Sequence, residues 1–109
     1  MQRGDFVLVA VAGDYGEPRP ALIVQSNLFF FFSSVTLCPL TSELRDDAPL
    51  LRIFVEPNET NGILKPSQIA VDRFTTVSTS RLRDIIGRAD DALMLQVTRA
   101  MAVFLAIGA

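Results

Sequence analysis

The sequence predicts one mainly β domain, a small curled sheet or barrel of short strands with a single helix packed against it. Three observations lead to this prediction. The chain has 109 residues, the length of one ordinary domain, and half of them are hydrophobic, which is enough for one core. Short runs rich in β-branched and aromatic residues recur up to residue 72. After residue 90 the apolar residues instead recur at three- and four-residue spacings, as on one face of a helix.

The first two strands are predicted at Phe6–Ala12 and Ala21–Gln25, on either side of a turn that contains GDYG. Pro20 has no N–H and fits the first position of a strand better than its interior, so the second strand should begin at or just after it. Arg19, enclosed between Pro18 and Pro20, is then expected at the entrance to this strand.

Three further strands are predicted at Val35–Leu40, Leu50–Val55 and Gln68–Asp72. A charged loop separates the first two of these, and the segment PNETNG, which is dense in turn formers, precedes the third. Several short strands followed by one helix favour a small sheet or barrel with the helix against it.

The helix is predicted to follow Asp90, whose carboxylate can accept N–H bonds from the first turn. Its apolar positions are Leu93, Met94, Val97, Met101, Phe104 and Leu105. These spacings indicate one amphipathic helix that ends near Gly108.

The segment Asn27–Ser34, NLFFFFSS, does not fit a simple strand. Side chains alternate between the two faces of a strand, so four consecutive phenylalanines cannot all point one way. Two interpretations remain open: a loop that folds back over the core, or a contact with a second copy of the chain.

The composition excludes several kinds of active site. Histidine is absent, which removes the usual general base and the usual metal ligand. Cys38 is the one cysteine, so no intramolecular disulfide is possible, and its apolar neighbours favour a buried thiol over a reactive one. Any chemistry must therefore use other groups.

The charges are unevenly distributed. The net charge of −2 argues against nucleic-acid binding, which usually needs a basic patch. However, the segment from residue 63 to 88 has five basic residues against two acidic ones, whereas residues 41–62 have two basic against five acidic. No apolar stretch reaches the roughly 18 residues of a membrane span, and we expect a cytoplasmic protein without membrane contact.

Arg19 is the first candidate functional residue. Pro18 and Pro20 restrict the backbone around it, which lowers the entropy lost when its guanidinium is held in place. A rigidly held arginine suits a phosphate, and the alternative is a surface arginine paired with Glu17. A second candidate is the pair of hydroxyls of Thr41 and Ser42, which follow a predicted strand and could cap a turn or bind a phosphate oxygen.

Five motifs stand in order along the chain: RGD at Arg3–Asp5, RPxLIVxSN at Arg19–Asn27, PLTS at Pro39–Ser42, LKPSxxxxD at Leu64–Asp72 and IGR at Ile86–Arg88. Together they resemble the MazF/PemK toxin family of endoribonucleases within the CcdB/MazF toxin superfamily. The resemblance covers nearly the whole chain. It implies one toxin-like endoribonuclease domain over residues 1–109.

The resemblance implies an SH3-like small barrel with a C-terminal helix, the CcdB/PemK toxin fold. It also implies a homodimer that acts as the toxin of a type II toxin-antitoxin system. Such a toxin cleaves single-stranded RNA at short sequences without a metal or other cofactor, and a cognate antitoxin blocks its RNA groove. Candidate surfaces for the dimer and the antitoxin are Phe29–Phe32 and the helix Asp90–Ala106.

The family's motifs assign roles to residues of this chain. Arg19 and Thr41 match the two positions usually regarded as catalytic, and Glu17 and Asp72 fall on or near family acids that are candidates for the general base. The residues expected to bind RNA are Ser42, Lys65, Arg73 and Thr76.

Elementary chemistry is compatible with these roles, because RNA supplies its own nucleophile, the 2′-hydroxyl. What the reaction needs is stabilisation of negative charge on the phosphorus centre, and a guanidinium offers paired donors to phosphate oxygens. Arg19 is expected to fill that role, and Thr41 to donate a second hydrogen bond.

The chain departs from the family pattern at two places. Its first loop, AGDYGEPRP, is short, and Thr75 stands where many relatives have an arginine. The alternative function is that of a CcdB-like DNA gyrase inhibitor, which has the same fold but a tryptophan near its C-terminus. This chain has no tryptophan and ends in LAIGA. A third interpretation is a barrel that binds RNA or an antitoxin without cleaving RNA.

Overall fold

The computed structural model of the chain describes residues 1–10, 16–30 and 33–109. Its strands are β1 (Asp5–Val9), β2 (Arg19–Ile23), β3 (Ser34–Thr41), β4 (Arg52–Val55), β5 (Ser67–Ala70), β6 (Thr75–Ser78) and β7 (Leu82–Arg88), and its helix is α1 (Asp91–Phe104). Single turns of 3₁₀ helix lie at Asn27–Phe29, Val71–Arg73 and Thr79–Arg81.

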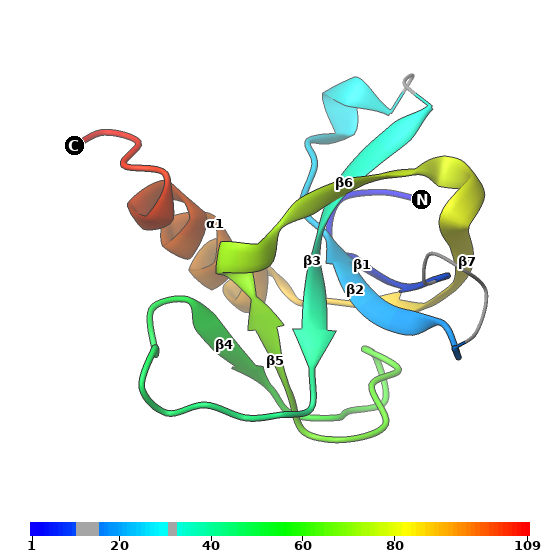
Figure 1. Cartoon of the computed structure of the whole chain (residues 1–109), viewed down its shortest axis with the longest axis horizontal. Helices are drawn as coiled ribbons and strands as arrows, with labels where there is room; N and C mark the ends of the chain where they lie inside the picture. Colours follow the sequence, from blue (N-terminus) through cyan, green and yellow to red (C-terminus); the bar gives the residue numbers. More distant parts are fainter. Residues whose placement is uncertain (11–15, 31–32) are drawn as a thin grey trace.

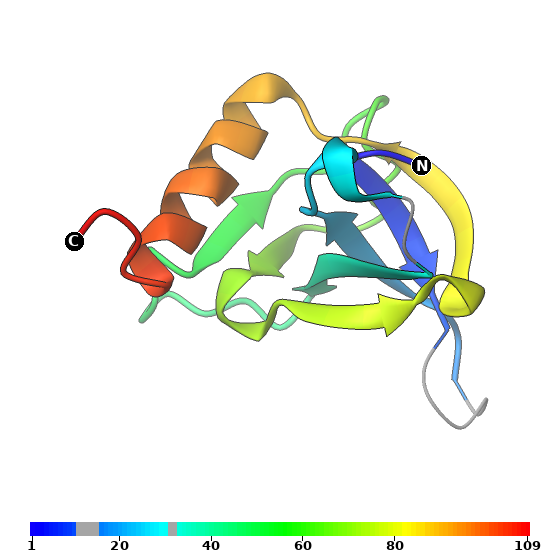
Figure 2. The same cartoon turned by 90° about the horizontal axis from the view of Figure 1, so that it is seen from above.

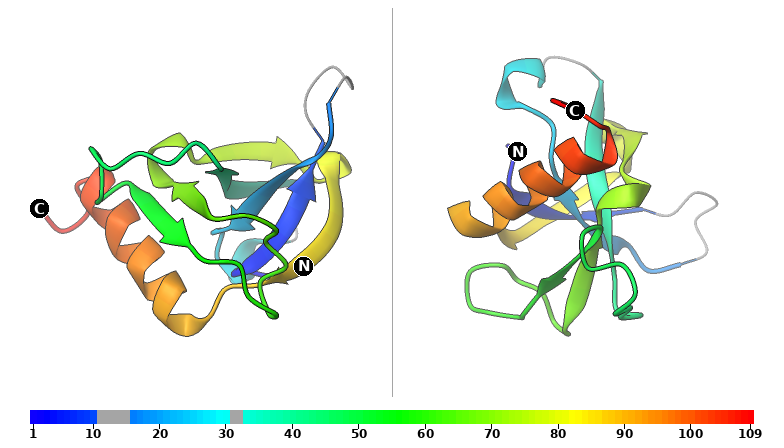
Figure 3. Two further views of the ribbon diagram at one scale, coloured as in Figure 1. Left: turned by 90° about the horizontal axis from the view of Figure 1, so that it is seen from below. Right: turned by 90° about the vertical axis from the view of Figure 1, so that its left-hand side faces the viewer.

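The seven strands form one antiparallel sheet with the order β4-β5-β3-β2-β1-β7, and β6 pairs with β3 (Figure 1). The sheet curls around itself, and α1 lies beside β4 (Figures 2 and 3). The predicted mainly β fold with a C-terminal helix is therefore confirmed. Among the described residues β4 and β7 do not pair with each other, so the predicted barrel is an open, curled sheet.

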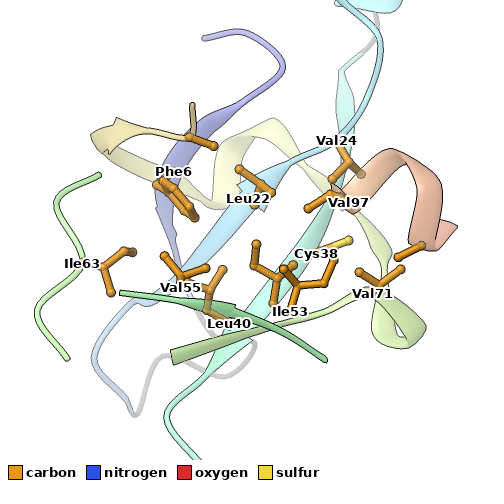
Figure 4. Packing of buried hydrophobic residues seen from close by; sticks show 13 residues of the cluster. Phe6, Leu22, Val24, Cys38, Leu40, Ile53, Val55, Ile63, Val71 and Val97 are labelled. Atoms are coloured by element: carbon orange, nitrogen blue, oxygen red, sulfur yellow. The ribbon is translucent and has the colours of Figure 1, made fainter. Parts of the chain in front are cut away.

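Both faces of the central strands are buried. One cluster lies between the sheet and α1 and includes Phe6, Leu22 and Val97 (Figure 4). A second cluster fills the other side of the curl and includes Val7 and Ile23. Because adjacent residues of β1 and of β2 enter different clusters, these strands read as continuous apolar runs.

Several predicted strand bounds need correction, including the end of the second strand, which is Ile23 rather than Gln25. β2 begins at Arg19, which pairs with Val9, so Pro20 is the second residue of the strand. β4 begins at Arg52 rather than at Leu50. β5 ends at Ala70, and Asp72 lies in the 3₁₀ turn that follows it. The predicted end of the first strand, residues 11–12, lies outside the described residues.

Sequence analysis missed β6 and β7. In β6 only Val77 is buried, and no residue of β7 is fully buried. Many positions in these two strands are serine, threonine or charged residues. The alternation of apolar and polar residues that marks the other strands is therefore weak here.

The helix begins as predicted but ends at Phe104, before the predicted end near Gly108. The Asp90 carboxylate accepts an N–H bond from Leu93 at 2.8 Å. Val97 and Ala100 are its buried residues, which confirms an amphipathic helix packed on the core. In the part of the chain that the structure describes, no helix is long and apolar enough to cross a membrane.

The segment Asn27–Ser34 contains the 3₁₀ turn Asn27–Phe29, and the Ser26 hydroxyl accepts an N–H bond from Leu28 at its start. Phe30 packs against the second cluster, as the folded-back interpretation predicts. Leu28 is largely exposed and Phe29 is half-exposed. Residues 31–32 lie outside the described residues.

The RGD motif anchors the N-terminus to three distant elements. The Arg3 guanidinium donates to the Val24 carbonyl at the end of β2 and to Thr98 Oγ1 of α1, the latter at 2.5 Å. The buried Asp5 carboxylate accepts from the Arg88 guanidinium at 2.6 Å. These bonds fix β7 and α1 against the first hairpin.

A loop packs its backbone directly on β7. The buried Asn61 side chain organises this loop: it donates to the Glu56 carbonyl at 2.9 Å and accepts from the N–H of Ile63 at 2.9 Å. A Cβ atom at Gly87 would lie 2.3 Å from the carbonyl carbon of Asn61. A Cβ at Gly62, whose φ is +69°, would lie 2.0 Å from the Ile86 carbonyl oxygen.

We predict that Gly87→Ala destabilises the fold by about 2 kcal/mol or more, because the new methyl group meets backbone atoms that cannot rotate away. The control is Gly16→Ala, where an added Cβ meets nothing within 4 Å. Urea unfolding of both variants and the wild type measures the difference. Equal stability of the two variants would contradict the close packing of this loop.

Candidate functional site

Arg19 and Thr41 lie on neighbouring strands, at the start of β2 and the end of β3. These strands pair in antiparallel register with Ala21 opposite Pro39. The β2–β3 pairing ends at Ala21 and Pro39, and Arg19 and Thr41 each lie two residues farther along, at the same end of the two strands. A register continued to these two residues would put them on the same face of the sheet.

Thr41 is held by the turn that follows β3. Its Oγ1 atom accepts a hydrogen bond from the N–H of Glu43 at 3.1 Å. The hydroxyl makes no donor bond within the described residues, so its hydrogen remains available for an acceptor. Turn capping and ligand binding, which the sequence left as alternatives, are therefore compatible in this residue. Ser42, the next residue, is exposed.

Arg19 is exposed, and the expected alternative of an ion pair with Glu17 is not observed. Among the described residues the ion pairs are Arg45–Asp47, Arg52–Asp72 and Arg88–Asp5. Glu17 is also exposed, two residues before Arg19. The guanidinium of Arg19 is therefore free to bind an anion from solution.

Asp72 is engaged by Arg52. Two guanidinium nitrogens of Arg52 donate to the two carboxylate oxygens at 3.0 and 3.2 Å. The Arg52 side chain is 6% exposed and that of Asp72 27%. The hydrogen bonds from Arg52 lower the pKa of Asp72, although partial burial opposes the shift. A general base that works near neutral pH needs a raised pKa, so the pairing with Arg52 argues against Asp72 in that role.

The remaining residues expected to bind RNA are dispersed. Lys65 is exposed in the segment before β5, and Arg73 is exposed in the 3₁₀ turn after it. Thr76 lies on β6, where its hydroxyl is 2.7 Å from that of Thr36. Side chains alternate along β3, so Thr36 and its partner lie on the opposite face from Thr41. The structure does not bring Thr76 to the Arg19–Thr41 pair.

Sequence analysis missed the part that Gln68 plays beside this site. Its side-chain amide bonds to the peptide N–H and C=O of Arg45, in the turn that follows Thr41. The signal was a glutamine within an otherwise apolar strand, since a buried amide must find partners.

Cys38 belongs to the core, as its neighbours in the sequence indicated. It is buried on β3. Burial raises the pKa of its thiol to about 12, so the nucleophilic thiolate is not populated near neutral pH.

Comparison with known proteins identifies a family. Residues 2–105 match the family described as the PemK-like, MazF-like toxin of type II toxin-antitoxin systems. A relative from Mycolicibacterium smegmatis, named probable endoribonuclease MazF, is 43% identical over 108 residues, which are 98% of each chain.

Solved structures share the fold. The Mycobacterium tuberculosis toxin MazF-mt6 superposes with a TM-score of 0.80 at 19% identity, over 96% of this chain and 99% of that one. A mycobacterial endoribonuclease in complex with its cognate antitoxin gives 0.81 at 24% identity, over 100% and 98% of the two chains. A MazE–MazF structure from Deinococcus radiodurans gives 0.80 at 17% identity, over 99% and 97%.

We predict that Asp72→Asn lowers the free energy of unfolding by about 1–2 kcal/mol at pH 7, because Arg52 loses a charged partner and Asp72 is only partly screened by water. The folded-state pKa of Asp72 is depressed, so its contribution is complete above the unfolded-state value of about 4 and is lost as the pH falls through the folded-state pKa. Urea unfolding of both proteins between pH 3 and 7 should show the difference shrinking toward acid. A difference that does not depend on pH would contradict this origin.

We also predict that Cys38 resists thiol reagents in the native protein, because it is buried and its pKa is raised. Labelling with Ellman's reagent at pH 8 should stay near zero in buffer and reach one thiol per chain in denaturant. Rapid labelling of the folded protein would place the thiol outside the core.

Proposed function

Because the chain belongs to the PemK-like, MazF-like toxin family of type II toxin-antitoxin systems, we propose that it cleaves single-stranded RNA by a metal-independent reaction, as one domain over residues 1–109. The observation that carries this proposal is that Arg19 and Thr41 lie at the same end of the neighbouring strands β2 and β3. Among the described residues the Arg19 guanidinium has no ion-pair partner, and the Thr41 hydroxyl makes no donor bond. A relative that is 43% identical is named an endoribonuclease, which supports the reaction class.

In the proposed reaction the RNA 2′-oxygen attacks the adjacent phosphorus. A bond from phosphorus to the 2′-oxygen forms as the bond to the 5′-oxygen breaks, which leaves a 2′,3′-cyclic phosphate and a free 5′-hydroxyl. Negative charge grows on the non-bridging oxygens in the transition state. Arg19 stabilises that charge with paired donors, and Thr41 donates a second hydrogen bond that orients the phosphate.

Glu17 is the proposed general base that accepts the proton of the 2′-hydroxyl, since it lies close to Arg19 in the chain and its carboxylate has no partner among the described residues. Asp72 is the second candidate, with its carboxylate held by Arg52. Arg19 is not assigned as the general acid, because the pKa of an arginine exceeds about 12.

We propose that four further side chains, which the fold distributes over several elements, bind the RNA backbone. Ser42 follows Thr41 directly, and Lys65 and Arg73 add positive charge on either side of β5. Thr76 lies on the other face of β3, so it would contact an RNA segment away from the cleaved phosphate.

The proposed partners are a second copy of the chain and a cognate antitoxin, and the proposed location is the cytoplasm. Related toxins have been solved as complexes with their antitoxins, which supports the second partner. The candidate contact surfaces are Phe29–Phe32, of which residues 31–32 lie outside the described residues, and the helix segment Asp90–Ala106, where Val103, Phe104 and Leu105 are exposed apolar residues.

The test is cleavage of a mixed-sequence single-stranded RNA in EDTA. We expect cyclic-phosphate ends from the wild type, a loss of at least about 100-fold in kcat for Arg19→Ala and a loss of about 10- to 100-fold for Thr41→Val. Arg99→Ala is the matched control, because Arg99 is an exposed arginine on α1 and should leave kcat unchanged.

Cleavage that stops in EDTA would contradict the metal-independent mechanism. No cleavage by folded wild-type protein on varied RNA would contradict the enzyme itself. Inhibition of DNA gyrase would then be measured, because the CcdB-like alternative predicts it.

A further inference from the structure

Gln68 is a buried residue bonded to two parts of the chain around Thr41. It lies on β5, is 7% exposed, and is the register partner of Thr41 on β3. Its side-chain Oε1 accepts a hydrogen bond from the N–H of Arg45 at 2.9 Å, and its Nε2 donates to the Arg45 carbonyl at 2.7 Å. Both polar ends of the amide are thereby bonded to the backbone of one residue, Arg45.

These bonds fix both ends of the turn that carries the Thr41 hydroxyl. The pairing of β3 with β5 sets the position of Thr41, and the Gln68 side chain sets the position of Arg45. Between them, the N–H of Glu43 donates to Thr41 Oγ1 at 3.1 Å. If Arg45 moves, the Glu43 N–H moves with it, and the Thr41 hydroxyl loses the bond that orients it.

Core packing and strand pairing hold β5 in place. Ile69, next to Gln68, is fully buried in the core beneath α1, and β4 pairs with β5 along its other edge, with Phe54 opposite Gln68. Packing in the core therefore fixes the backbone at Gln68, and the Gln68 side chain in turn fixes the position of Arg45 in the turn.

We propose that Gln68 is a positioning residue for the phosphate site, which sets the geometry of the Thr41 hydroxyl through the peptide of Arg45. This inference rests on the proposed function for its effect on catalysis. A misplacement of about 1 Å in a catalytic group can lower a rate about 100-fold, so the loss of these two bonds should appear in kcat rather than in KM.

The test uses Gln68→Glu, which keeps the shape and the acceptor but removes the amide donor. When ionised, the introduced carboxylate faces the Arg45 carbonyl without a hydrogen, and when protonated it can donate to that carbonyl again. Two ion pairs lie nearby, Arg45–Asp47 in the turn and Arg52–Asp72 beside β5. Both are present in the wild type, so the ratio of variant to wild-type kcat isolates the introduced group.

Gln25→Glu is the matched control. Gln25 also bridges two backbone groups with its amide: Oε1 accepts from the N–H of Thr36 at 3.0 Å, and Nε2 donates to the Phe29 carbonyl at 3.2 Å. It lies beyond the opposite end of β2 from Arg19. The same chemical change is thus made in a similar bridge away from the site.

We expect Gln68→Glu to lower kcat about tenfold or more at pH 8 with KM within twofold, and the ratio to wild type to rise as the pH falls toward 5. Gln25→Glu should stay within twofold of the wild-type kcat at every pH. Gln68→Met, which has a similar volume and no donor, should lose kcat without recovery at low pH. A Gln68→Glu protein that is folded and has wild-type kcat at every pH would overturn the proposal.

A second readout does not depend on cleavage. Hydrogen exchange of the Glu43 amide, measured by NMR in the free protein, should be faster in Gln68→Met and in ionised Gln68→Glu, and unchanged in Gln25→Glu. Inactive wild-type protein would refute the proposed function, whereas the Glu43 exchange rates would still decide whether Gln68 fixes this turn. Unchanged exchange in both Gln68 variants would overturn the positioning role.

Discussion

Strand β3 is the constraint on which the rest of the sheet depends, because it pairs with three other strands. Along one edge it bonds to β2, and along the other it bonds first to β6 and then to β5. Pro39, which has no N–H to donate, stands between the last residue paired with β6 and the first paired with β5. β3 therefore changes its partner along this edge, and Thr41 lies at the end of the strand that pairs with β5.

The five motifs of the sequence fall into two groups: those whose side chains hold the fold together, and those that carry the candidate site residues. RGD and IGR bind each other through Asp5 and Arg88, and Arg3 ties the same region to α1. They hold the fold together, whereas RPxLIVxSN and PLTS supply Arg19 and Thr41, at the same end of the neighbouring strands β2 and β3. A match to these motifs is therefore evidence for the fold as much as for the chemistry of the site.

Much of the fold could be predicted from the sequence, and the reasons for the failures are physical. β1 to β3 and α1 carry strong apolar patterns because their side chains enter the core, whereas β6 and β7 bury too few residues to leave such a pattern. Of the site, Arg19 and Thr41 were identified by motif, but their proximity depends on strand register, which no local pattern encodes. The bonds from Arg52 to Asp72 and from Gln68 to Arg45 join residues 20 and 23 positions apart, so only the folded chain shows them.

Among the described residues Arg19 has no ion-pair partner, which has a thermodynamic consequence for the binding of a phosphate. The phosphates of a nucleic acid carry condensed cations, and an arginine that binds a phosphate releases some of them into bulk solution. The translational entropy that these cations gain adds to the hydrogen bonds that the arginine forms. Had Arg19 been paired with Glu17, the ligand would first have had to separate two charges within the protein. No carboxylate of the described residues competes in this way for the charge at the start of β2.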